Sequence, residues 1–198
     1  FKGGTYDCSP SVAKWNTTQR GVLNIQHFDW DNVKRSRPTC LIDYLFHLKG
    51  NPKVTAYIDH FYASIALTDG DFFISNSEFH QRKQLDVTHT TTTSVTLTSC
   101  IFDQIALNLD LIDSFTMDKC KWTFPNGLIN AKVVRLSNNV FDFQNGAQSI
   151  VEVGNYVKTL EFLGNKISDC GRETPCLKVV SKHRPSISIN IDNNIFGG

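Results

Sequence analysis

The chain has 198 residues, 40% of them hydrophobic, and its 20 basic and 19 acidic residues leave a formal net charge of +1. A near-neutral chain without a block of like charge argues against nucleic acid or an anionic membrane as the main partner. No apolar run approaches the roughly 18 residues that a membrane span needs, and the length suits one domain with its own core.

Residues 1–50 contain no complete repeat, although Trp15, Trp30 and the run from Cys40 to Phe46 supply apolar side chains. The sequence Asn16-Thr17-Thr18 is the one N-glycosylation sequon of the chain, so Asn16 is a candidate glycosylation site. Terminal units of repeat folds are usually atypical, because they cover the open end of the core. We therefore interpret residues 1–50 as an N-terminal cap with imperfect first coils, followed by repeats over 51–198.

Three apolar columns recur seven times between Val54 and Phe196. The anchors of the repeats are Phe61, Phe79, Phe102, Trp122, Phe141, Ile167 and Phe196. Five residues earlier, at position −5, stand Ala56, Ile74, Leu97, Met117, Leu136, Phe162 and Ile191. Seven residues earlier, at position −7, stand Val54, Phe72, Val95, Phe115, Val134, Leu160 and Ile189. Repeats of about 20 to 30 residues are typical of stacked architectures.

The spacing of the columns indicates strands. Positions −7 and −5 lie two residues apart, so the segment alternates between core and solvent as a strand does. The repeats are rich in β-branched and aromatic residues, and several carry a second apolar segment after the anchor, as in Ile105 to Leu107. We therefore predict an all-β fold, a single-stranded parallel β-helix of about eight coils. The usual chirality of parallel crossovers makes it right-handed.

Small polar residues and cysteines share a column two residues before the anchors. These residues are Asp59, Ser77, Cys100, Cys120, Asn139, Asn165 and Asn194. Such a stacked position suggests a turn, in which asparagine tolerates left-handed backbone and forms a hydrogen-bond ladder along the stack.

The cysteine count is even, at six, which suits a secreted or cell-surface domain with a few bridges. Cys100 and Cys120 occupy one column in consecutive coils, where two stacked thiols would fit but a disulfide is the arrangement that we predict. Cys170 and Cys176 flank a short loop that a disulfide would close. Cys8 and Cys40 remain for the cap. The histidines and cysteines do not form the close pairs of a zinc site, so we predict no metal or cofactor.

The segment Tyr57-Ile58-Asp59-His60 resembles a short motif of pectate lyases. Over roughly residues 54–198 the chain resembles the right-handed β-helix (pectin-lyase-like) superfamily at the level of fold. The resemblance implies a polysaccharide-active enzyme, either a lyase or a glycoside hydrolase, with Asp59 and His60 in its site. Paired carboxylates of the kind that hydrolases use are not evident.

A second candidate groove lies on the outward columns of successive repeats. Arg135 and Glu161 share position −6, and Asp118 lies at −4 on the same face. A cross-strand ion pair explains the first two residues, and a sugar-binding or catalytic groove is the alternative.

The complete register and the lack of a convergent catalytic set favour a non-enzymatic extracellular module over an enzyme. We expect a structural or adhesive segment, fibre-forming or part of a longer surface protein, with glycans as candidate ligands. The final coil, Ile187 to Phe196, keeps the full pattern. We expect neighbouring copies or further coils of the same chain to cover this end.

Overall fold

The computed structural model describes residues 14–17, 22–29, 45–62, 64–79, 85–88, 94–144, 151–154, 156–170, 175–180 and 187–197. Side chains are described for 70–79, 94–107, 109–144, 153–154, 156–170, 175–180 and 187–197. None of these residues lies in a helix, and every strand pairing is parallel. In the described part of the chain there is accordingly no helix that could cross a membrane. The predicted class, an all-β parallel β-helix, is confirmed.

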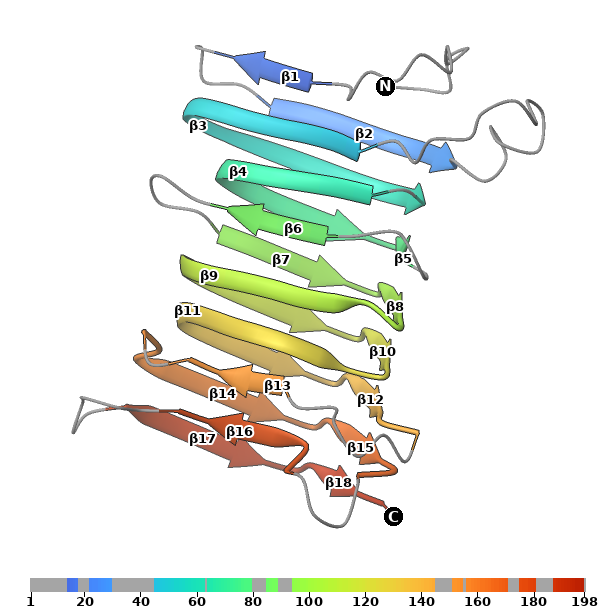
Figure 1. Ribbon diagram of the computed structural model, residues 1–198, viewed down its shortest axis with the longest axis vertical. Helices are drawn as coiled ribbons and strands as arrows, with labels where there is room; N and C mark the ends of the chain where they lie inside the picture. Colours follow the sequence, from blue (N-terminus) through green and yellow to red (C-terminus); the bar gives the residue numbers. More distant parts are fainter. Residues whose placement is uncertain are drawn as a thin grey trace.

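The strands stack in chain order from the N-terminal to the C-terminal end (Figure 1). They are β1 (Lys14–Thr17), β2 (Val22–Asp29), β3 (Leu45–Tyr62), β4 (Ser64–Ser75), β5 (Glu78–Phe79), β6 (Leu85–Thr88), β7 (Ser94–Thr98), β8 (Ile101–Asp103), β9 (Ala106–Asp118), β10 (Lys121–Thr123), β11 (Asn126–Ser137), β12 (Val140–Asp142), β13 (Val151–Val153), β14 (Thr159–Leu163), β15 (Lys166–Ser168), β16 (Leu177–Val179), β17 (Ser188–Asp192) and β18 (Ile195–Phe196). β3 begins before residue 50 and continues past it, so no strand boundary marks the predicted division between the cap and the repeats. That division stays a prediction.

Three rows of stacked segments surround the core. Row A comprises β1, β6, β13, β16 and the first halves of β3, β4, β9 and β11. Row B comprises β2, β7, β14, β17 and the second halves of the same long strands. Row C is a separate sheet of six strands, β5, β8, β10, β12, β15 and β18. About eight coils were predicted. In the described residues six coils have a strand in all three rows, and two further coils, β1 with β2 and the two halves of β3, have strands in rows A and B.

The predicted columns are in register for six of the seven repeats. Pairings from Phe72↔Val95 to Leu160↔Ile189 align position −7, and those from Phe79↔Phe102 to Ile167↔Phe196 align the anchors. The apolar segments predicted after the anchors form row A.

The first predicted repeat is wrong by two residues. In the structure Ala56, not Val54, pairs with Phe72. A shift of two residues keeps every side chain on the same face of a strand, so the alternation of apolar residues does not distinguish the two registers.

The inward columns form a continuous core. The side chains at −7, −5 and the anchor position are at most 3% exposed from Phe72 to Ile167. Aromatic rings continue from coil to coil, with centroids 5.2 Å apart for Phe79 and Phe102 and 6.3 Å apart for Trp122 and Phe141. The buried Trp122 ring nitrogen donates to the Ile105 carbonyl oxygen at 2.9 Å, so its polar group is satisfied.

Each sharp turn between row B and row C contains one residue with positive φ. These residues are Asn76, Ser99, Lys119, Asn138, Gly164 and Asn193, with φ between 47° and 64°. They stand three residues before the anchor, so the left-handed residue lies one position earlier than predicted. The asparagines at −2 instead form hydrogen bonds along the stack.

Phe141 provides a test of this core. We expect Phe141→Asp to prevent folding, because a carboxylate would replace a side chain that is 2% exposed in mid-stack. Phe141→Ala should lower the free energy of unfolding by about 3–5 kcal/mol. Val140→Ala, on the outward side of the same strand, should cost about 0.5 kcal/mol or less. Urea denaturation followed by circular dichroism measures all three, and equal losses for Phe141→Ala and Val140→Ala would contradict the assigned faces.

Candidate functional site

The asparagines at −2 form a directional ladder inside the turn. The side-chain oxygen of Asn139 accepts from the Cys120 backbone N–H at 2.9 Å, and its amide nitrogen donates to the Met117 carbonyl oxygen at 2.9 Å. Asn165 makes the equivalent bonds to the Asn139 N–H and the Leu136 carbonyl oxygen. Each asparagine therefore satisfies the main chain of the coil before it, which confirms the predicted ladder.

Asn194 is the last described rung of this ladder. Its side-chain oxygen accepts from the Asn165 N–H at 2.8 Å, and its amide nitrogen donates to the Phe162 carbonyl oxygen at 2.7 Å. Its own backbone N–H has no acceptor among the described residues. A further asparagine in this column would place its side-chain oxygen beside the Asn194 N–H, at the C-terminal end of the stack.

Cys100 and Cys120 continue the ladder column as thiols. Both are buried, and the Cys100 backbone N–H donates to Cys120 Sγ at 3.3 Å. The predicted disulfide between them is wrong: both cysteines are free in the structure and stack as thiols. In a parallel, in-register stack both Cβ atoms point the same way, whereas a disulfide needs them turned toward each other.

The environment of Cys120 keeps its thiol protonated. A side-chain hydrogen bond with Cys100 and then burial raise the pKa of Cys120 far above its ordinary value of 9.0. Because the folded-state pKa is raised, the stability that this group contributes is present below pH 9.0 and is lost as the pH rises further. A buried neutral thiol of this kind is unreactive.

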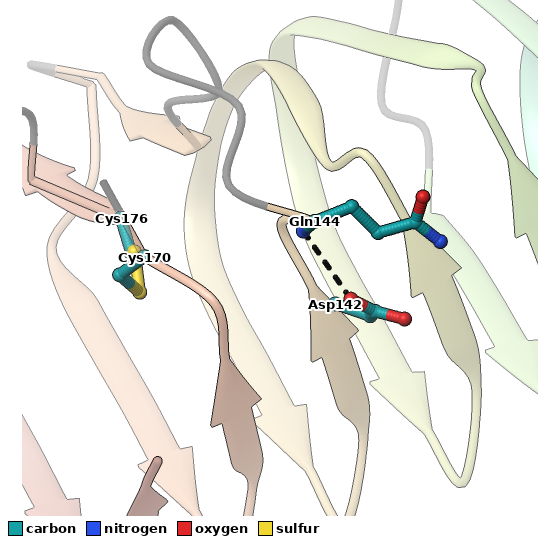
Figure 2. Close-up of a disulfide and its surroundings, with 4 residues drawn as sticks. All are labelled: Asp142, Gln144, Cys170 and Cys176. Atoms are coloured by element: carbon teal, nitrogen blue, oxygen red, sulfur yellow. Dashed lines mark hydrogen bonds between the residues drawn. A yellow bond between two sulfur atoms is a disulfide. The ribbon is translucent and has the colours of Figure 1, made fainter. Parts of the chain in front are cut away.

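The predicted disulfide between Cys170 and Cys176 is present, with a Cα–Cα distance of 5.7 Å. Figure 2 shows this bridge and the turn after β12 on the preceding coil, where the Gln144 backbone N–H donates to Asp142 Oδ1 at 3.3 Å. Cys170 and Cys176 help to line a hollow at the end of the core. Cys8 and Cys40 lie outside the described residues.

The cross-strand ion pair predicted on the outward face of row B is present, and Asp118 on the same face also has hydrogen-bond partners. Arg135 Nε lies 2.9 Å from Glu161 Oε2, and the two side chains are 47% and 34% exposed. Water screens such a pair, so its contribution to stability is about 1 kcal/mol or less. Asp118 Oδ1 accepts from Ser137 Oγ at 2.8 Å and from Asn138 Nδ2 at 2.9 Å.

The candidate residues Asp59 and Asp118 lie in different coils. Asp59 and His60 lie in β3, and their side chains are outside the described set, as is that of Asn16 in β1. Pairings place Asp59 three strand spacings from Asp118, roughly 14 Å between Cα atoms. Carboxyl pairs in glycosidases stand about 5–9.5 Å apart. In the described part of the chain, no group of three or more His, Cys, Asp or Glu side chains could hold a metal ion.

Four of the seven large apolar side chains that are exposed in the described residues lie at the C-terminal end. Ile189, Ile191 and Phe196 keep the inward columns but are 47%, 51% and 69% exposed. The hollow beneath them is lined by Phe162, Cys170, Pro175, Cys176, Leu177, Ile191 and Phe196. The repeat pattern predicted the three exposed residues. It did not predict that Pro175 lines the hollow, whereas Leu177 belongs to one of the second apolar segments predicted after the anchors and lies in β16.

The cysteine assignments are testable by mass spectrometry without reduction. We expect one disulfide peptide that links Cys170 and Cys176. Cys100 and Cys120 should resist iodoacetamide in the folded protein and react once urea unfolds it, because both thiols are 2% exposed or less. A peptide that links Cys100 to Cys120, or rapid alkylation of either thiol in the native state, would contradict the structure.

Comparison with known proteins gives no relative: the chain matches no protein-family model, no curated protein and no solved structure.

Proposed function

We propose that the chain is a non-enzymatic, extracellular structural or adhesive module, extended at its C-terminal end by a neighbouring copy or by further coils. The observation that carries the proposal is the last coil. It keeps all three inward columns and the ladder asparagine, yet Ile189, Ile191 and Phe196 are about half exposed or more. Exposed apolar residues beside an unpaired strand edge mark an interaction surface.

Two features support the non-enzymatic part of the proposal. Polar side chains on the outward face of row B bond to one another, as in the Arg135–Glu161 pair. The same face presents a flat array of hydroxyl groups on β7 and β9, namely Ser94, Thr96, Thr98, Ser114 and Thr116. Such an array suits adhesion to glycans. A distant relationship to the right-handed β-helix (pectin-lyase-like) superfamily is part of the proposal, and it leaves the function open because fold alone does not determine function.

The extracellular part is supported by the Cys170–Cys176 disulfide, since such bridges persist in oxidising compartments. Glycosylation of Asn16 would agree with the same location and is part of the proposal.

A turnover assay separates this module from a polysaccharide-active enzyme. We expect neither unsaturated uronates nor new reducing ends when the protein is incubated with pectate or other uronate polymers, whereas glycan-array binding without turnover would support adhesion. Turnover that Glu161→Gln abolishes would overturn the proposal. Asn190→Gln is the matched control, because Asn190 pairs with Glu161 in the same outward column of the next coil.

A further inference from the structure

We propose that the C-terminal end binds one further parallel β-coil that carries an asparagine opposite Asn194. The inference deepens the proposed function and rests on it, since it specifies what covers the open end. The occupant is defined by its pattern: apolar residues at −7, −5 and the anchor position, and asparagine at −2.

The first argument is the repeated hydrogen bond at −2. The backbone N–H groups of Cys120, Asn139 and Asn165 each donate to the side-chain oxygen of the next asparagine, at 2.9, 2.9 and 2.8 Å. Asn194 continues this series, but its N–H has no acceptor among the described residues. The geometry of three successive steps thus fixes where the missing acceptor would stand.

The second argument is that an asparagine side chain can both accept a hydrogen bond from the preceding coil and donate one to it. Its amide nitrogen also donates to the preceding coil, at the carbonyl oxygens of Met117, Leu136 and Phe162. The equivalent acceptor on the last coil is the Ile191 carbonyl oxygen, since Ile191 pairs with Phe162. The serine at this column, Ser77, donates its Oγ–H to the Ser75 carbonyl oxygen of its own coil at 2.7 Å.

The third argument is the apolar surface. Leu160, Phe162 and Ile167 are at most 3% exposed, because the next coil covers them. Their counterparts Ile189, Ile191 and Phe196 lack such a cover, and the adjoining hollow is lined largely by apolar side chains. A coil with apolar residues at the same three positions would bury them as in the interior of the stack.

The turn at this end differs from the earlier turns in one hydrogen bond. The backbone N–H groups of Lys119, Asn138 and Gly164 donate to a carbonyl oxygen of the next coil. At the same position, the Asn193 N–H donates to Asp192 Oδ1 at 2.9 Å. The Asp192 side chain thus occupies the place of the next main chain, and an incoming coil would replace it.

The probe is a synthetic peptide with the sequence of residues 159–168, Thr-Leu-Glu-Phe-Leu-Gly-Asn-Lys-Ile-Ser, which contains the complete pattern. A fluorescent label on the peptide allows its binding to the intact protein to be followed by anisotropy. A second peptide carries Asn165→Leu. The protein variants are Phe196→Lys, in the inward column, and Ile195→Lys, which points outward from the same strand and is similarly exposed, at 64% against 69%.

We expect saturable binding of the first peptide to the unaltered protein and to Ile195→Lys. Binding should weaken by about tenfold or more for Phe196→Lys and for the Asn165→Leu peptide, because a buried apolar contact or two hydrogen bonds are lost. Thermal melting of both variants checks that they fold. No binding to the unaltered protein, equal binding of both peptides, or undiminished binding to a folded Phe196→Lys variant would overturn the proposal. Polymer turnover would remove the proposed function without changing these affinities, so the two failures are distinguishable.

Discussion

The C-terminal half of the structure depends on asparagine side chains that reach back from three successive turns, at Asn139, Asn165 and Asn194, to the coil before each. A sharp turn between two short strands leaves buried N–H and C=O groups that strand pairing does not reach. Asn139 and Asn165 supply an acceptor and a donor for these groups and are each 1% exposed. Because the bonds run between coils, the turn of one coil is completed only when the next coil is in place.

This dependence connects the fold to its proposed use. In a stack whose coils complete one another's hydrogen bonds, each coil needs the next one. The last coil therefore presents donors, acceptors and apolar side chains that no coil covers. Asn194 and Phe196 show both properties at the C-terminal end. The outward face differs, because Arg135, Glu161 and Asp118 already have partners. The end of the stack, more than its side, is therefore the surface with unsatisfied interactions.

Much of this architecture could be predicted from the sequence, because large apolar residues at a period of two specify both strand and face. The Arg135–Glu161 pair followed from the same register. The first repeat did not, since Val54 and Ile58 are both apolar and a slip by two residues conserves the pattern. The disulfide predicted between Cys100 and Cys120 was wrong, because column spacing gives the separation of two residues but not the direction of their side chains.

Backbone amide exchange, measured by NMR on the isolated protein, tests the ladder most directly. The amides of Cys120, Asn139 and Asn165 donate to buried asparagine oxygens and should exchange only through opening of the stack. The Asn194 amide should exchange at nearly the rate of an unprotected amide, because its N–H has no acceptor among the described residues. Equal protection of Asn194 and Asn165 in the monomer, or fast exchange at all four positions, would contradict the account.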